Sequence, residues 1–372
     1  MPKKMKKMLF LSPMPLGNES SGISIRINAL KPQFENFGIK VKVADRYSGE
    51  EADFFYAMVS THTDSISNQI VDIIPPDKKL IIDLYTPIFL EKNLSFNIFN
   101  PCHWIVRFQK KQVVKKIIQR GNHFLVANRR QREYWLKTAK SLGLKINNNN
   151  ISVLPTGVAK IKVRRLSASK CKVILWFGGI YPWMYPVPLI EAFSQIASRY
   201  PDWKLRILGG FQPKTGYSKI YESVISLAHQ KINKNQLEII PWQKETRMPK
   251  YLSDVAFAVH LPKKTKEDYY AHRARLLTLL SFGIPVMTSG SDLISQLLVK
   301  EQAGLKILPF PDQIAKTLES LFRSPQKIKV LSKKGLIIES MFIKKNRDFS
   351  IIKIFSNNKL SNMNLEVAKR HL

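Results

Sequence analysis

The chain has 372 residues, an apolar fraction of 44% and two cysteines. This length exceeds the usual size of one hydrophobic core, so two domains are expected, and the apolar fraction excludes an intrinsically disordered protein. So few cysteines exclude a disulfide scaffold and favour the cytoplasm. The seven histidines are scattered without metal-ligand spacing, so we expect no metal site. No apolar run approaches the roughly 20 residues that span a bilayer.

The charge balance is strongly basic, with 60 lysines and arginines against 27 acidic residues and a net charge of +33. Such a charge attracts polyanions, namely phosphates, nucleic acids or an anionic membrane surface. The excess is spread over nearly the whole chain, so a composition bias explains it at least as well as a dedicated site does. Because no helix-turn-helix, RNP-type or zinc motif accompanies the charge, we expect no specific nucleic-acid partner.

The first half of the chain alternates between strand patterns and helical patterns. We expect strands at residues 8–12, 41–44, 52–59, 80–84, 123–127 and 151–155, and helices at residues 23–37 and 129–142. Asn128 can cap the second of these helices, which ends before Gly143. A Gly/Ser-rich turn, Gly17–Gly22, follows the first strand. The order strand, Gly-rich turn, helix, strand is typical of the start of a parallel α/β sheet.

A basic, irregular stretch at residues 160–170 is the best candidate for an interdomain linker. After it we expect strands at residues 173–177, 203–208, 237–240, 255–260 and 285–288, and helices at residues 187–200, 217–231, 248–253, 273–282, 292–301, 314–322 and 327–339. Two such series predict an α/β protein of two doubly wound domains, with ligands at the strand ends that face the cleft between them. We place the domains at residues 1–160 and 161–343, followed at 344–372 by a helix crossing back to the first domain and a disordered basic tail.

Several motifs of the second half occur in the order of one known domain. They are Phe177–Trp183, Pro188–Phe193, Tyr200–Leu205, Leu208–Gly210, His272–Arg275 and Ser281–Thr288. In this order they resemble the C-terminal domain of family-4-type glycosyltransferases, which are retaining enzymes with the GT-B fold. In the first half, Ile81–Glu91 and Phe124–Trp135 are similar to a divergent bacterial branch of the same family. The likeness extends from about Met8 to about Phe322.

The resemblance implies two Rossmann-like domains that face each other across a cleft, with the nucleotide-sugar donor on the C-terminal domain and the acceptor on the N-terminal one. It implies transfer of a sugar from a UDP- or GDP-linked donor, as co-substrate, to a glycan or lipid-linked acceptor, without a metal cofactor. The expected role is the assembly of cell-envelope polysaccharide or glycolipid. We expect the enzyme in the cytoplasm or at the inner face of the cytoplasmic membrane.

The donor site must stabilise the negative charge that develops on the leaving diphosphate, which requires fixed cations and backbone N–H groups. Arg273 and Arg275 lie at the start of an expected helix, where the helix dipole adds to their charge. Gly178 and Gly179 close the first strand of the donor domain and let the backbone approach a phosphate or sugar. A solvated helix start and a plain tight turn are the structural alternatives. The expected donor-binding residues are therefore Gly178, Gly179, His272, Arg273, Arg275 and Ser289, the histidine and the serine by resemblance.

Candidates for the acceptor side come from the first half. Asp83 ends an apolar strand, where a carboxylate can orient acceptor hydroxyls or act as a catalytic base; capping of the next turn is an equal alternative. Gly17 and Gly22 bound the Gly/Ser-rich turn, and His62 follows a later strand. We assign these three residues to acceptor binding, although a lone histidine more often has no such role.

The sequence departs from the family at its acidic motif, which has two glutamates separated by seven residues. The corresponding positions here are Tyr270 and Thr278, so both carboxylates are absent, while Glu267 and Asp268 lie nearby but out of register. The alternative function is therefore a catalytically silent GT-B protein that binds a glycan or a partner.

The segment at residues 94–120 mixes apolar and aromatic residues with lysines and arginines. A basic amphipathic segment can lie on an anionic membrane surface, which would suit a lipid-linked acceptor. The alternative, which we slightly favour, is an ordinary helix that packs on the N-terminal sheet.

Overall fold

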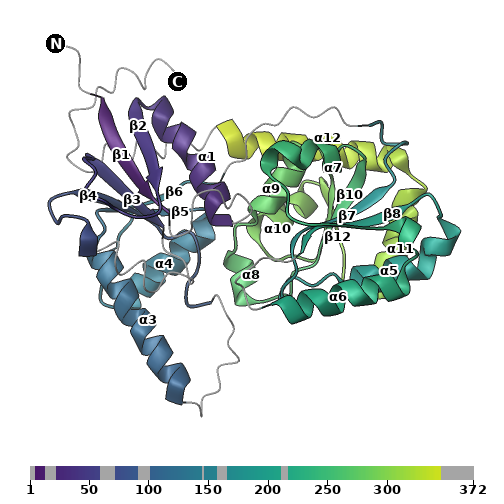
Figure 1. Cartoon of the computed structure of the whole chain (residues 1–372), viewed down its shortest axis with the longest axis horizontal. Helices are drawn as coiled ribbons and strands as arrows, with labels where there is room; N and C mark the ends of the chain where they lie inside the picture. The colour runs from purple at the N-terminus through teal and green to yellow at the C-terminus, as the bar shows by residue number, and fades with distance from the viewer. Residues whose placement is uncertain are drawn as a thin grey trace. The chain divides into compact units, whose positions relative to one another are not determined.

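The structure is a computed structural model, which describes residues 5–12, 22–58, 72–90, 101–144, 146–156, 166–210 and 217–344. The chain divides into two compact units (Figure 1). The first comprises Met1–Gly157, Tyr270–His272 and Phe342–Leu372, and the second comprises Val158–Tyr269 and Arg273–Met341. This division differs from the predicted one chiefly because it assigns Tyr270–His272 to the first unit.

The first unit is built on a parallel sheet whose order in the described residues is β2-β1-β3-β4-β5-β6. Its strands are β1 (Lys6–Leu11), β2 (Ile39–Ala44), β3 (Phe54–Met58), β4 (Lys79–Asp83), β5 (His123–Val126) and β6 (Ile151–Val153), and its helices are α1 (Gly22–Asn36), α3 (Pro101–Arg120) and α4 (Arg129–Ser141). Successive side chains of a strand point to opposite faces. Phe10 accordingly packs in the core shared with α1, and Leu9 in the core shared with α3 and α4.

The second unit contains a parallel sheet whose order in the described residues is β12-β11-β10-β7-β8-β9. Its strands are β7 (Val173–Gly179), β8 (Lys204–Gly210), β9 (Leu237–Ile240), β10 (Val255–His260), β11 (Val286–Thr288) and β12 (Gly304–Lys306). Its helices are α5 (Val187–Ile196), α6 (Ser218–Lys231), α7 (Met248–Leu252), α8 (Lys266–Tyr270), α9 (Ala274–Ser281), α10 (Leu293–Lys300), α11 (Pro311–Phe322) and α12 (Pro325–Lys344). Counted from β7, this is the Rossmann strand order, which reverses direction between β7 and β10.

The expected alternation of strands and helices is confirmed in both units. Asn128 caps α4 as predicted, because its Oδ1 atom accepts a hydrogen bond from the backbone N–H of Gln131 at 2.9 Å. Two short elements of five and three residues, α8 and β12, were not predicted. The helix expected at residues 187–200 ends at Ile196 and continues as a short 3₁₀ turn, Ala197–Arg199.

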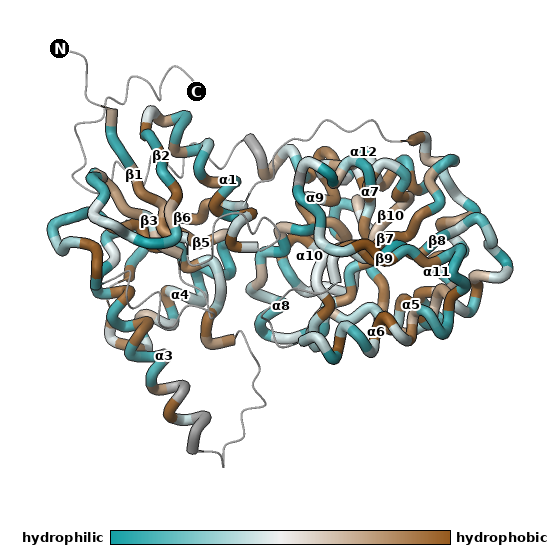
Figure 2. The backbone as a smooth tube through the Cα atoms, viewed as in Figure 1, coloured by the Kyte–Doolittle hydropathy of each residue, from teal (hydrophilic) through white to brown (hydrophobic). Residues whose placement is uncertain are grey.

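Of the segment predicted to be amphipathic, residues 101–120 form α3, along which hydrophobic and hydrophilic stretches follow one another (Figure 2), and residues 94–100 lie outside the described residues. Its second half packs on the sheet through Val114, Ile117 and Ile118, which are buried. The interpretation as a packing helix therefore holds for this half. None of the helices that the structure describes is long and apolar enough to cross a membrane.

Candidate functional site

The reversal of strand order between β7 and β10 singles out one edge of the second sheet. In doubly wound sheets, ligands bind outside the carboxyl ends of the strands at such a reversal. Here these ends are Gly179 of β7, His260 of β10 and, one strand further, Thr288 of β11. Together with the loops and helix starts that follow them, they form the switch-point edge.

Arg275 lies against the end of β7. Its Nη1 atom donates to the carbonyl oxygen of Phe177 at 3.3 Å, and a Cβ atom at Gly178 would lie only 2.5 Å from the same nitrogen. Gly178 also has a φ of +114°, which residues with side chains rarely adopt. The close approach of the guanidinium thus requires glycine at this position. Because Arg275 belongs to the first turn of α9, its predicted place at a helix start is confirmed.

The neighbouring Gly179 makes room for an aromatic ring. A Cβ atom there would lie 2.3 Å from the Tyr181 ring, which stacks on Trp183 with centroids 5.1 Å apart and 11° between the ring planes. Tyr217 packs edge-on against both rings. Burial raises the pKa of Tyr181, so its hydroxyl stays protonated and able to donate a hydrogen bond. The two glycines therefore accommodate an arginine and a tyrosine of this chain, a use that their spacing does not predict.

Arg273, the other predicted phosphate ligand, is held by acidic residues. It is the N-cap residue of α9, and its Nη2 atom donates to Glu267 Oε2 and Asp268 Oδ1, both at 2.9 Å. Its side chain is only 12% exposed. Glu267 and Asp268 are the carboxylates that lie out of register with the family's glutamates. They compensate the charge of Arg273 inside the unit.

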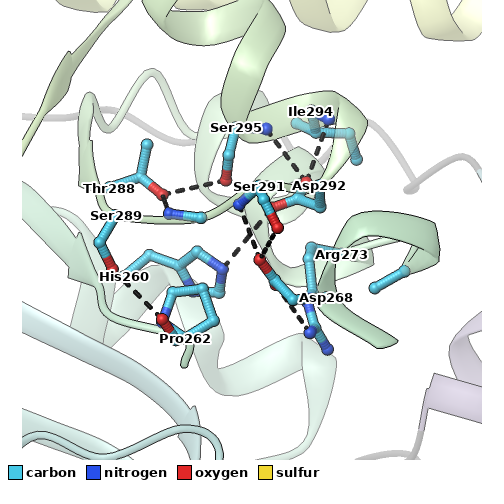
Figure 3. A network of polar contacts seen from close by, with 12 residues as sticks. His260, Pro262, Asp268, Arg273, Thr288, Ser289, Ser291, Asp292, Ile294 and Ser295 are labelled. Carbon is cyan, nitrogen blue, oxygen red and sulfur yellow. Dashed lines mark hydrogen bonds and ion pairs between the residues drawn. The ribbon is translucent and has the colours of Figure 1, made fainter. Parts of the chain in front are cut away.

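Asp268 also binds the loop that follows β11, residues 289–292 (Figure 3). Its Oδ2 atom accepts hydrogen bonds from the backbone N–H and from the Oγ of Ser291, both at 2.7 Å. Ser289, a predicted donor ligand, donates from its backbone N–H to the carbonyl oxygen of His260 at 3.1 Å. The structure thus places Ser289 at the switch-point edge, and its role in donor binding stays a prediction.

A histidine lies buried beside this loop, and the aspartate that ends the loop is buried as well (Figure 3). Asp292 caps α10, because its Oδ1 accepts from two backbone N–H groups of the first turn, both at 3.0 Å. Its Oδ2 lies 4.0 Å from His260 Nε2, and neither atom has a hydrogen-bond partner in the described part of the chain. Burial raises the pKa of Asp292 to about 6. Burial, followed by the charges of Arg275 and Arg273, lowers the pKa of His260 well below its ordinary value.

These two groups predict opposite pH dependences of stability. The raised pKa of Asp292 means that the folded state binds this proton more tightly than the unfolded chain, so stability increases as pH falls through about 6. The lowered pKa of His260 means that the unfolded chain binds its proton first, so stability decreases as pH falls through the ordinary histidine range. Relative to the wild type, we expect acidification to lower the free energy of unfolding of Asp292→Asn, a variant that keeps the capping oxygen. We expect acidification to raise that of His260→Gln. Each change is on the order of 1–3 kcal/mol.

Thermal unfolding from about pH 8 to about pH 5 measures both differences. Taking each variant relative to the wild type removes the contribution of groups that titrate independently of the substituted residue, whereas the charges of Arg273 and Asp268 remain part of the shift of Asp292. Curves of the same slope for the two variants would contradict the assignment of opposite shifts.

The remaining predicted site residues lie elsewhere. His272 falls in the first unit, and burial lowers its pKa to about 3, so it carries no charge at neutral pH. Gly22 is the first residue of α1. Gly17 and His62 lie outside the described residues. The binding roles of these four residues stay predictions.

Asp83 lies at the end of β4 and pairs with Arg26 of α1. Arg26 Nε donates to Asp83 Oδ2 at 2.8 Å, and both side chains are 0% exposed. Tyr56 of β3 donates to the same oxygen at 2.6 Å. Arg26 Nη1 donates to the carbonyl oxygen of Leu154 and to Thr156 Oγ1. The carboxylate is therefore held from two neighbouring elements, and its catalytic or acceptor-binding role stays a prediction.

Sequence reasoning missed Arg26, although a signal exists. The residue falls on the apolar stripe of α1, beside Ile23 and Ile27, where an arginine has to be buried. A buried charge needs an internal partner.

Among the described residues, no group of three His, Cys, Asp or Glu side chains is placed to hold a metal ion.

Comparison with known proteins gives both a family match and structural neighbours. Residues 158–336 match the model of the family described as glycosyl transferases group 1. No curated protein sequence matches that of this chain. Among solved structures, Anabaena HepE in complex with UDP and glucose shares 14% identity at a TM-score of 0.62, covering 96% of this chain and 100% of that one. Sucrose-phosphate synthase from Thermosynechococcus elongatus shares 10% identity at a TM-score of 0.66, covering 95% of this chain and 98% of that one.

The likeness to these structures covers nearly the whole chain, at identities that establish the fold alone. It confirms the prediction of the GT-B fold with two Rossmann-like domains. The family match falls on the part of the chain that contains the switch-point edge. The chain therefore has the GT-B fold, and its residues 158–336 match the family of glycosyl transferases group 1.

Proposed function

We propose that the protein transfers a sugar from a UDP- or GDP-linked donor to a glycan or lipid-linked acceptor. The observation that carries this proposal is the guanidinium of Arg275, held at the end of β7 where the strand order reverses. The family match supports a glycosyltransferase. The solved complexes of Anabaena HepE with UDP and with UDP-glucose support a nucleotide sugar as the donor.

The residues at the switch-point edge fit a leaving diphosphate. Cleavage of the bond between sugar and diphosphate places negative charge on the phosphate oxygens, which a fixed cation and oriented donors stabilise. Arg275 supplies the cation, the start of α9 adds the positive end of a helix dipole, and Tyr181 supplies a protonated hydroxyl. We propose that no metal is required for this step, because Arg275 provides the positive charge.

We place the acceptor on the first unit, with Asp83 as its ligand. Arg26 and Tyr56 hold Asp83 through Oδ2, which fixes the direction of Oδ1. Oδ1 is buried and has no hydrogen-bond partner in the described part of the chain, so it keeps the capacity to accept a hydrogen bond from an acceptor hydroxyl that reaches it. Retention of the anomeric configuration, membership of a divergent bacterial branch and a role in cell-envelope polysaccharide or glycolipid assembly are parts of the same proposal, and they rest on the sequence resemblance.

A thermal-shift panel of UDP- and GDP-sugars tests the donor. A ligand that binds only the folded state raises the unfolding temperature according to its affinity, so the expected result is a rise with one nucleotide and one sugar. No rise with any nucleotide sugar at millimolar concentration would refute the proposal. Binding without any release of nucleotide diphosphate would favour the silent glycan- or partner-binding protein, which the residues Tyr270 and Thr278 at the two glutamate positions motivate.

We further propose that the first unit docks on an anionic membrane surface, as a lipid-linked acceptor would require. The first half of α3 exposes Trp104, Ile105 and Phe108, with exposed fractions of 50%, 57% and 62%. Lys111, one turn after the phenylalanine, is exposed as well. Aromatic and aliphatic side chains next to a lysine favour the boundary between anionic headgroups and acyl chains.

Replacing Trp104 and Phe108 together with serine is expected to weaken binding to phosphatidylglycerol vesicles by at least about tenfold, because two large apolar side chains no longer enter the interface. Co-sedimentation with the vesicles measures this change. The matched control replaces Leu308 and Phe310, two exposed apolar residues of the second unit, and should bind as the wild type does. Unchanged binding by the α3 variant, or equal binding of the wild type to uncharged phosphatidylcholine vesicles, would contradict the proposal.

A further inference from the structure

We propose that Asp268 is a positioning residue of the donor site, and that it acts by fixing the loop at residues 289–292. The inference rests on the proposed function. Asp268 belongs to α8, an element that the sequence patterns did not predict, and it is 1% exposed. A carboxylate buried to this degree is stable only when it is fully paired.

The two oxygens of Asp268 have separate partners (Figure 3). Oδ1 accepts from Arg273 at the start of α9, at 2.9 Å. Oδ2 accepts from the backbone N–H and the hydroxyl of Ser291, both at 2.7 Å. Hydrogen bonds to a carboxylate are roughly twice as strong as those between neutral groups. One buried group therefore connects the start of α9, where Arg275 lies, to the loop that follows β11.

The other contacts of the loop are local or lead back to the sheet. The backbone N–H of Gly290 donates to Thr288 Oγ1 at 2.9 Å, and a Cβ atom at Gly290 would lie 2.6 Å from Ser295 Oγ. Ser289 bonds to the end of β10. These hydrogen bonds shape the loop, and the charge of Arg273 at the start of α9 acts on Asp292 at its end. Asp268 adds hydrogen bonds that join the loop to Arg273.

Asp268 and Asp292 also determine which helix start is open to an anion. Asp292 occupies two backbone N–H groups in the first turn of α10, and Asp268 occupies that of Ser291 just before it. A diphosphate bound at α10 would have to displace these carboxylates and would be repelled by them. At the start of α9 the carboxylates of Glu267 and Asp268 are paired with Arg273, so Arg275 is the cation that we assign to the donor phosphates, while the loop contributes shape to the site.

Loss of the Asp268 bonds is expected to weaken donor binding, because a smaller fraction of the molecules then has the loop in the binding position. The apparent Kd rises by the inverse of the fraction of molecules whose loop is in the binding position. In Asp268→Asn, an amide N–H group faces the donors of either Arg273 or Ser291, so one side of the connection is lost. We expect the Kd for UDP-glucose to rise at least about tenfold, which corresponds to the loss of one hydrogen bond to a charged group.

Isothermal titration with UDP-glucose, and with UDP alone, measures this effect at a temperature where the variant is fully folded. The matched control is Asp254→Asn, since Asp254 also pairs with a buried arginine of the second unit, Arg206, at 2.6 and 2.9 Å. The control is expected to lower the unfolding temperature and leave the Kd unchanged. Asp268→Glu, which keeps the charge, is expected to recover part of the affinity.

An unchanged Kd in Asp268→Asn overturns the inference, and so does an equal rise in Asp254→Asn, which would reflect general destabilisation. Should Asp268→Asn fail to fold, Ser291→Ala settles the question, because it removes the hydroxyl bond to Asp268 and keeps the backbone one. A Kd raised about threefold supports the connection, and a wild-type Kd refutes it. If the wild type itself binds no UDP- or GDP-sugar, the proposed function fails and the inference with it, so the two failures are distinguishable.

Discussion

Arg275→Ala is expected to raise the Kd for the donor about a hundredfold while the protein stays folded. The total loss of kcat/KM is expected to be on the order of 10²–10³-fold. The guanidinium is the charge that the structure holds at the end of β7, and the developing negative charge of the diphosphate is largest in the transition state. Alanine is a good helix former, so α9 can still begin at its present residue.

Titration with UDP-glucose and steady-state release of UDP measure the two effects separately. Arg275→Lys is expected to recover only part of the loss, because an ammonium group lacks the planar fork that lies along Gly178 and the Phe177 carbonyl. Arg199→Ala is the control for net charge, since Arg199 is a half-exposed arginine of the same unit that pairs with Glu319. A wild-type Kd in Arg275→Ala, or an equal loss in Arg199→Ala, would show that Arg275 does not bind the donor.

Those parts of the fold that depend on local patterns could be predicted from the sequence. The apolar run at residues 80–84 predicts β4, and Asn128 before an amphipathic stretch predicts the start of α4; both are confirmed. Strand order depends instead on pairing between residues far apart in the chain, such as Val259 with Trp176. The motifs indicated the second sheet as the donor side, but the reversal between β7 and β10 required the structure.

The candidate site could be predicted only in part, because the roles of its residues depend on tertiary contacts. Arg273 and Arg275 are equivalent by spacing and chemistry, and only the structure shows that Glu267 and Asp268 surround the first of them. The two carboxylates lie out of register with the family motif, so the resemblance implied no role for them. Gly178 was predicted to let the backbone approach a phosphate or sugar; in the structure an arginine of this chain fills that space, and the donor-binding role of Gly178 stays a prediction.

Removal of either member of the buried pair Arg26 and Asp83 is expected to destabilise the first unit by about 3–5 kcal/mol, because the remaining charge has no counter-ion in the interior. The double variant Arg26→Met/Asp83→Asn buries no charge, and its asparagine can still accept from Tyr56. It is therefore expected to be more stable than either single variant. Urea unfolding followed by circular dichroism gives the four free energies of a double-mutant cycle, and strictly additive losses would contradict a coupled ion pair.

The same double variant separates the structural role of Asp83 from its proposed role at the acceptor. Its substitutions lie in the first unit, so the Kd for UDP-glucose at the switch-point edge of the second unit is expected to match that of the wild type. Transfer to the acceptor is expected to fall at least about tenfold, because an amide replaces the carboxylate oxygen that would bind the acceptor hydroxyl. Wild-type transfer by a stable double variant would remove Asp83 from the acceptor site and leave it as the counter-ion of Arg26. A loss of transfer with unchanged donor binding would instead support an acceptor site at the end of β4.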